Sequence, residues 1–147
     1  MTADDQIELL LVQDDPADRV LTLDDLTDHK LVNHLEAVSD VATAMAYLLG
    51  AAPYETPHVP DLVLLDLNLP RHDGRTLLKR LRETPATAPV PVILLVNSPA
   101  AEHILRAQDL PVQGYAVKPV TFEHLAAVVR DLHELGFRVI RHRRATS

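Results

Sequence analysis

Residues 61–74, "DLVLLDLNLPRHDG", combine a clear strand pattern with an isolated carboxylate. Residues 62–65 are uninterrupted Leu and Val, which is typical of a strand buried on both faces of a parallel sheet. Asp66 ends this apolar run, and a proline and a glycine follow soon after it. Because burying a charge costs free energy unless the charge is compensated, the position of Asp66 needs an explanation from the rest of the chain.

Short apolar runs recur along the chain, at residues 7–12, 35–38, 62–65, 92–96 and 115–117. Segments with helical spacing lie between them. The spacing i, i+3, i+4, i+7 is met by Val41, Ala44, Met45 and Leu48, and a glycine stands where that helix would stop. Further helices are predicted after Asp15-Pro16, around 77–81, over 100–107 and from 122 to 132. Strand then helix, five times, predicts an α/β fold with a doubly wound five-stranded parallel sheet and flanking helices.

The bulk properties of the chain exclude several classes of protein. Its 147 residues suit a single domain, and the formal net charge of −7 argues against a nucleic-acid binder. No apolar run approaches the roughly 18 residues of a membrane span, and the polar N-terminus "MTADDQ" is not a secretory signal. The chain has no cysteine, hence no disulfide or thiolate chemistry. A soluble cytoplasmic domain without membrane contact is expected.

Three charged residues follow predicted strands at the edge where ligands bind in such sheets. Asp14 follows the first strand, Asp66 the third and Lys118 the fifth. Neighbouring carboxylates repel each other, and a divalent cation with oxygen ligands, such as Mg²⁺, relieves this repulsion. Lys118 supplies a positive charge that suits a phosphoryl oxygen. The pattern predicts phosphoryl transfer onto Asp66 at a hydrated, metal-bound rim of the sheet.

Four ordered motifs carry a resemblance to a known family: "LLLVQDDPAD" at 9–18, "DLVLLDLNLPRHDG" at 61–74, "PVILLV" at 91–96 and "GYAVKPV" at 114–120. Together they resemble the receiver domain of bacterial two-component response regulators, most closely single-domain regulators of phytochrome-type histidine kinases. The resemblance spans about residues 7–135. It implies a flavodoxin-like strand order 2-1-3-4-5, a receiver domain over 1–135 and a C-terminal extension over 136–147.

The resemblance also assigns roles to residues. It implies that Asp66 accepts a phosphoryl group from a histidine kinase, and that this kinase is a bacteriophytochrome. It implies that Mg²⁺ binds Asp14, Asp66 and the backbone carbonyl of Asn68, and that Lys118 pairs with the phosphoryl group.

Three more positions take family roles beside the acceptor. The Lys118-Pro119 peptide is expected to be cis, and Tyr115 to be the aromatic switch residue. Gly74 is expected to close the loop after Asp66 with an unusual backbone angle.

Two positions depart from the family pattern. Gln13 stands where Glu or Asp is usual, which removes a negative charge near the ion and predicts weaker metal binding. Val96 stands where Thr or Ser is usual, and a valine has no hydroxyl to bond a phosphoryl oxygen. Ser98 is not expected to replace that hydroxyl. A weakened switch follows.

Three functions compete at this stage. The first is a stand-alone response regulator, not an enzyme, whose output is protein contact or phosphate relay because no DNA-binding segment follows within the chain. The second is a pseudo-receiver that binds partners without phosphorylation, which Gln13 and Val96 keep open. The third is a haloacid-dehalogenase-type phosphatase, which would need a second aspartate where this chain has Asn68.

The C-terminal extension has its own pattern. Gly136 breaks the preceding helix, and Phe137, Val139 and Ile140 form a short apolar strand-like segment. Such a segment is not stable alone in water and needs a surface to cover it. It either folds back on its own domain or pairs with a second copy, as the resemblance suggests. We expect a homodimer in the unphosphorylated state.

Overall fold

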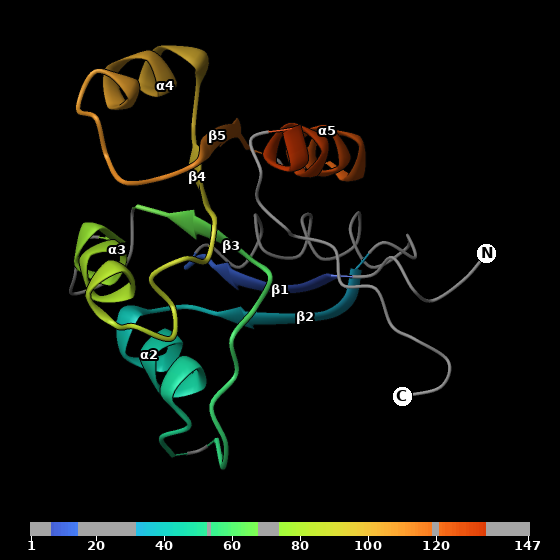
Figure 1. Ribbon diagram of the computed structural model, residues 1–147. Coiled ribbons are helices and arrows are strands. Elements are labelled where there is room, and N and C mark those ends of the chain that lie inside the picture. The colour runs from blue at the N-terminus through green and yellow to red at the C-terminus, as the bar shows by residue number, and fades with distance from the viewer. Residues whose placement is uncertain (1–6, 15–31, 53, 68–73, 119–120, 135–147) are drawn as a thin grey trace.

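A computed structural model describes residues 7–14, 32–52, 54–67, 74–118 and 121–134 (Figure 1). Its strands are β1 (Ile7–Val12), β2 (Val32–Val38), β3 (Leu62–Asp66), β4 (Val92–Val96) and β5 (Gly114–Val117). All adjacent strands pair in parallel, in the order β2-β1-β3-β4-β5. The predicted doubly wound sheet and its flavodoxin-like order are confirmed. Strand β2 begins three residues before its apolar pattern indicated, because an edge strand tolerates polar residues such as Asn33 and His34.

The described helices are α2 (Val41–Leu49), α3 (Gly74–Glu83), α4 (Pro99–Arg106) and α5 (Phe122–Glu134). The helix predicted after Asp15-Pro16 lies outside the described residues. Helix α2 begins where the Asp40 carboxylate accepts from the Thr43 amide at 2.7 Å, and it ends at Gly50, whose φ of 75° is left-handed. None of the described helices is both long enough and apolar enough to cross a membrane.

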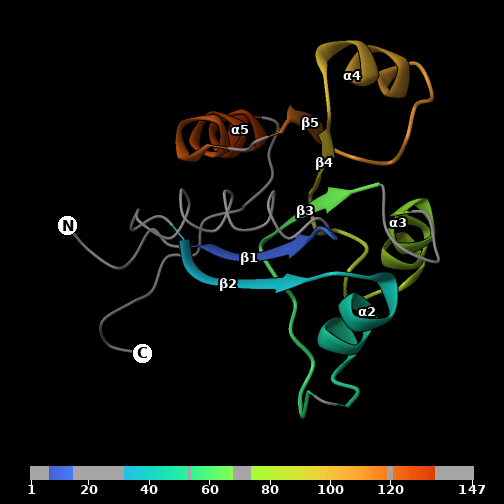
Figure 2. The same ribbon diagram turned by 180° about the vertical axis from the view of Figure 1, so that it is seen from behind.

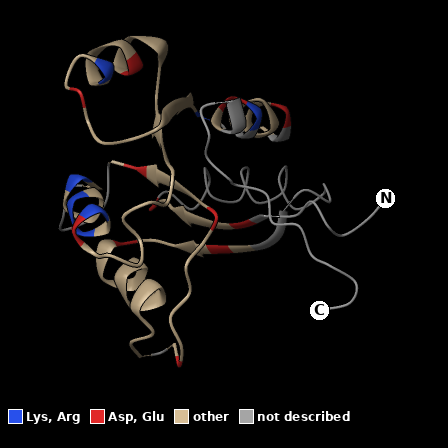
Figure 3. Cartoon of the chain, in the orientation of Figure 1, with Lys and Arg blue, Asp and Glu red and all other residues tan. Residues whose placement is uncertain are grey.

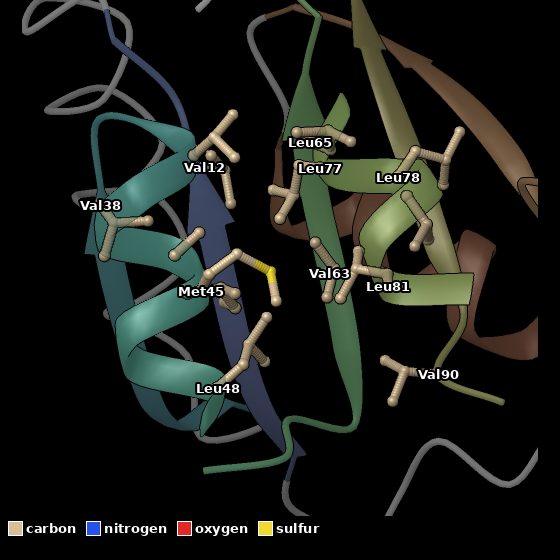
Figure 4. Packing of buried hydrophobic residues seen from close by; sticks show 14 of the residues in the cluster. Val12, Val38, Met45, Leu48, Val63, Leu65, Leu77, Leu78, Leu81 and Val90 are labelled. Atoms are coloured by element: carbon tan, nitrogen blue, oxygen red, sulfur yellow. The ribbon is translucent and has the colours of Figure 1, made fainter. Parts of the chain in front are cut away.

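The sheet carries a hydrophobic core on each face. On one face, β1, β3 and β4 pack against α2 and α3, with Met45, Leu48, Leu77 and Leu81 filling the space between (Figure 4). On the other face the same strands pack against α5 through Leu125 and Leu132 (Figure 2). Every residue of β3 and β4 is buried, which accounts for their uninterrupted apolar sequences.

Helix α4 is attached differently from the other described helices. None of its side chains is buried, and Ile104 is 61% exposed. It is held to β5 by Tyr115, whose hydroxyl donates to the Leu105 carbonyl at 3.3 Å. The Arg106 guanidinium lies 4.6 Å from the centre of the same ring. Few packing contacts therefore oppose a displacement of α4.

Arg82 connects α3 to the segments that precede β4 and β5. Lys and Arg positions gather on α3 (Figure 3), and Arg82 is the partly buried one among them. Its guanidinium donates to the carbonyls of Ala88 at 2.9 Å, Val90 at 2.7 Å and Pro111 at 3.0 Å. It also donates to the Gln113 side chain at 2.8 Å. These bonds fix the segments that lead into β4 and β5.

We predict that Arg82→Ala destabilises the fold by about 1.5–3 kcal/mol, the usual contribution of hydrogen bonds to a charged group. Arg80→Ala is the matched control, because Arg80 lies exposed on the same helix. Urea unfolding compares the free energies of the two variants. Equal effects on both would show that the Arg82 hydrogen bonds contribute nothing to stability.

Candidate functional site

Strand register places Gln13 beside Asp66. Val12, the last residue of β1, pairs with Leu65 of β3, and Gln13 and Asp66 each follow one member of this pair in the chain. The backbone N–H of Gln13 donates to the Val38 carbonyl of β2 at 3.0 Å. The alternate residues that precede the pair belong to the core on the α5 side: Leu9, Leu11, Leu62 and Leu64. By the two-residue period of a strand, the Gln13 and Asp66 side chains point toward that same side.

Lys118 reaches Asp66 from the far side of β4. Ala116, two residues earlier, also belongs to the α5-side core, so Lys118 continues along that face. The Lys118 Nζ lies 2.5 Å from Asp66 Oδ2, and the two side chains are only 10% and 4% exposed. The expectation of a hydrated rim at Asp66 is wrong. A buried ion pair with Lys118 compensates the carboxylate that ends the apolar strand.

Asp14 lies at the same edge of the sheet and is exposed. Asn68, predicted to supply a backbone carbonyl to the metal, lies outside the described residues, as does Pro119 of the predicted cis peptide. Within the described residues there is no cluster of three or more His, Cys, Asp or Glu side chains that could hold a metal ion.

The Gln13 side chain is buried without a partner. It has 0% exposure, and among the residues that the structure describes neither its side-chain amide oxygen nor its side-chain amide nitrogen has a hydrogen-bond partner. An unsatisfied buried polar group costs about 1–3 kcal/mol, so such groups in folded proteins call for an explanation.

A cavity of about 270 Å³ opens beside Asp66. It lies between the ends of β3 and β4 and the helices α3 and α4, and its walls include Leu67, Arg75, Val96, Asn97 and Ile104. Val96 therefore shares a cavity with Asp66 but offers it only methyl groups. The Ser98 hydroxyl instead accepts from the Ala101 amide at 3.1 Å, where it caps α4. Ser98 is not among the residues that line the cavity beside Asp66.

Tyr115 lies between the sheet and α4. Burial raises the pKa of the Tyr115 phenol, and the nearby Arg106 charge opposes that rise. A phenol with a raised pKa stays protonated at neutral pH and remains a donor to the Leu105 carbonyl. Tyr115 thus connects β5 to the helix beside the cavity.

Gly74 is required for a different reason from the one predicted. Within the described residues, only Gly50 among the glycines has a positive φ, so the unusual angle expected at Gly74 is wrong. A Cβ at Gly74 would lie 2.8 Å from the Leu67 Cα and 2.9 Å from the Asp66 carbonyl oxygen. The Gly74 amide donates to the Leu67 carbonyl at 2.9 Å. Only a residue without a side chain lets α3 start this close to the backbone of Leu67 and Asp66.

Comparison with known proteins agrees with this geometry. The family model of the response regulator receiver domain matches residues 9–130. Response regulator Rcp1 of Synechocystis sp. is 30% identical over 132 residues, which cover 90% of this chain and 90% of Rcp1.

Solved structures of similar proteins share the fold. The bacteriophytochrome response regulator AtBRR gives a TM-score of 0.78 at 32% identity, covering 87% of this chain and 93% of that chain. The phosphorylated cyanobacterial phytochrome response regulator RcpA gives 0.70 at 32% identity, with coverages of 92% and 98%. The Mn²⁺-bound form of Rcp1 gives 0.67 at 29% identity, with coverages of 94% and 99%.

We predict that Lys118→Met destabilises the fold by about 3–5 kcal/mol, because it leaves the buried Asp66 carboxylate without its cation. The double variant Asp66→Asn, Lys118→Met should lose much less than the sum of the two single variants, since the stranded charge is gone. Urea unfolding of all four proteins at neutral pH gives the coupling energy. Additive single effects would mean that the two side chains do not interact in solution.

Proposed function

The chain belongs to the response regulator receiver domain family, and from this premise we propose that it accepts a phosphoryl group from a histidine kinase onto Asp66. The single observation that carries the proposal is the buried Asp66–Lys118 pair beside an open cavity. A cation placed against an acceptor carboxylate stabilises the charge of an incoming phosphoryl group.

The transfer follows from the groups at the site. A carboxylate oxygen of Asp66 attacks the phosphorus of a phosphohistidine, the new P–O bond forms as the P–N bond breaks, and the electron pair stays on the imidazole. Lys118 then has phosphoryl oxygens within reach in place of the bare carboxylate. Several of the similar proteins are named as phytochrome response regulators, which supports a phytochrome-type histidine kinase, a bacteriophytochrome, as the partner.

We propose Mg²⁺ as the cofactor, held by Asp14, Asp66 and the backbone carbonyl of Asn68. The chemistry of the site fits a hard cation, because the groups at its edge are carboxylate oxygens and one of them is exposed for ligand exchange. When bound, the ion neutralises charge on the transferred phosphoryl group. The Mn²⁺-bound form of the similar protein Rcp1 is consistent with a divalent ion here.

Two other functions remain distinguishable from this one. A phosphatase of the haloacid dehalogenase type needs a general acid two residues after the nucleophile, and Asn68 cannot act as one. A pseudo-receiver would bind its partners without any transfer to Asp66. Family membership favours a signalling protein over an enzyme, and phosphoryl labelling separates the receiver from the pseudo-receiver.

Asp66→Asn should abolish labelling by acetyl phosphate or by a cognate kinase, because an amide cannot form the acyl phosphate. Asp61→Asn is the matched control: Asp61 lies just before β3, at the end opposite Asp66, and accepts there from the Glu8 amide at 2.8 Å. Label on the control and none on Asp66→Asn is the expected result. Label retained on Asp66→Asn, or no label on the parent chain, would contradict the proposal.

We propose that Val96 weakens the conformational response to phosphorylation. A hydroxyl at this position would bond a phosphoryl oxygen, a charge-assisted bond of about 1.5–3 kcal/mol, or roughly 10- to 100-fold in a conformational equilibrium. The parent chain should therefore show small amide shifts on adding beryllofluoride, and Val96→Thr should show larger shifts that reach Tyr115. Amide NMR spectra decide this. Large shifts at Tyr115 in the parent chain would contradict it.

We also propose that the chain forms a homodimer through Phe137, Val139 and Ile140, together with the face from α4 to α5. The three side chains lie outside the described residues, and the proposal rests on their apolar pattern. Burying them would contribute roughly 1.5–3 kcal/mol each. A two-fold pair is the commonest oligomer of soluble proteins.

Sedimentation of the full chain and of residues 1–135 tests the dimer. We expect a dimeric full chain without phosphorylation and a monomeric truncated chain. Phe137→Asp combined with Val139→Asp in the full chain should also give a monomer. A monomeric full chain, or a truncated chain that stays dimeric, would contradict the assignment of these residues.

A further inference from the structure

The buried amide of Gln13 is the feature at the edge of the sheet that the proposed transfer does not use. Both of its polar atoms are buried and neither has a hydrogen-bond partner. Thr87, the other uncharged polar side chain with 0% exposure, donates its hydroxyl to the Leu81 carbonyl at 2.8 Å. Thr87 therefore has a hydrogen-bond partner for its buried hydroxyl, whereas the buried side-chain amide of Gln13 has none among the described residues.

The position of Gln13 identifies what it can meet. It is the neighbour of Asp66 across β1 and β3, and it faces the side of the sheet from which Lys118 reaches the Asp66 carboxylate. The carboxylate itself does not reach the Gln13 amide, since no bond joins them. A phosphoryl group on Asp66 would extend the side chain by two covalent bonds and add three acceptor oxygens beside this amide.

The two orphan atoms have different requirements. The amide nitrogen donates, so it needs an acceptor, and a phosphoryl oxygen is one. The amide oxygen accepts, so it needs a donor, and a water molecule bound to a cation can only donate because its lone pair faces the metal. A carboxylate at this position could accept from the metal-bound water but could not donate to a phosphoryl oxygen.

We infer that Gln13 is a phosphoryl-binding residue, whose amide N–H donates to an oxygen of the phosphoryl group on Asp66. This donor stands on the β1 side of the acceptor, whereas the hydroxyl that Val96 lacks would have stood on the β4 side. The inference rests on the proposed function of Asp66. It assigns to this chain a phosphoryl contact that an acidic residue at position 13 could not make.

Two substitutions separate the donor from the acceptor. Gln13→Met keeps the length of the side chain and removes both polar atoms. Gln13→Glu keeps an acceptor and removes the donor. For each protein, calorimetric titration measures the affinity for Mg²⁺ alone and then the affinity for beryllofluoride, a phosphoryl analogue, at saturating Mg²⁺.

We expect beryllofluoride to bind about 10-fold or more weakly to both variants, as the loss of one hydrogen bond to a charged group implies. Mg²⁺ alone should bind Gln13→Met more weakly than the parent, because no amide oxygen accepts from a metal-bound water, and should bind Gln13→Glu more tightly because a negative charge has been added. Unchanged beryllofluoride binding by Gln13→Met would overturn the inference. Gln13→Glu binding beryllofluoride as well as the parent would also overturn it, since an acceptor alone would then suffice.

Thermal unfolding without ligand gives an independent readout. Removing an orphan polar group should leave the Tm of Gln13→Met equal to or above that of the parent. Thr87→Val is the matched control, and its Tm should fall because it loses a satisfied buried hydrogen bond. A Tm of Gln13→Met that falls as far as that of Thr87→Val would show that the amide already has a structural partner. If the parent chain binds no beryllofluoride at all, the proposed function fails, whereas equal binding by the parent and Gln13→Met refutes only the role of Gln13.

Discussion

A carboxylate held at the end of a fully buried strand is the constraint on which the site depends. Asp66 is 3% exposed, and an isolated charge in that place would be strongly unfavourable. Lys118 relieves this cost through a direct ion pair with Asp66. The strand order places β5 next to β4 and β4 next to β3, so Lys118, which follows β5, reaches Asp66 across the end of β4. The strand order brings together two residues that are 52 positions apart in the chain. The close start of α3 at Gly74 lies against the backbone of the same Asp66.

The same constraint shapes what the site can do. A phosphoryl group on Asp66 would draw Lys118 away from the bare carboxylate and fill space beside the cavity under α4. Among the described residues, that helix buries no side chain. Tyr115 contacts it through a hydrogen bond to the Leu105 carbonyl and a cation–π contact with Arg106. A loosely packed helix beside the acceptor can be displaced at low cost. Val96 lines that cavity and has no hydroxyl, so under the proposed function it would not link a phosphoryl group to a displacement of α4.

Most of the fold could be predicted from the sequence, because β3 and β4 are uninterrupted apolar runs and the helices carry recognisable caps and periodic patterns. The ends of β2 could not, since an edge strand carries polar residues like those of a loop. The meeting of Asp66 and Lys118 was predictable from strand-end positions, but its burial was not, because the exposure of a strand end depends on what packs above it. The lack of hydrogen-bond partners for the Gln13 side chain among the described residues could not be predicted, because it depends on which groups pack around that side chain in the fold. The close approach at Gly74 was likewise invisible, because a required glycine looks the same whether φ or space demands it.

The central claim is that Asp66 is the residue that carries the phosphoryl group. Reducing the phosphorylated chain with borohydride converts an aspartyl phosphate to homoserine, and peptide mass spectrometry then locates the change. The account predicts homoserine at position 66 and an unmodified Asp14. Homoserine at any other position, or a phosphoryl group that resists borohydride, would contradict it.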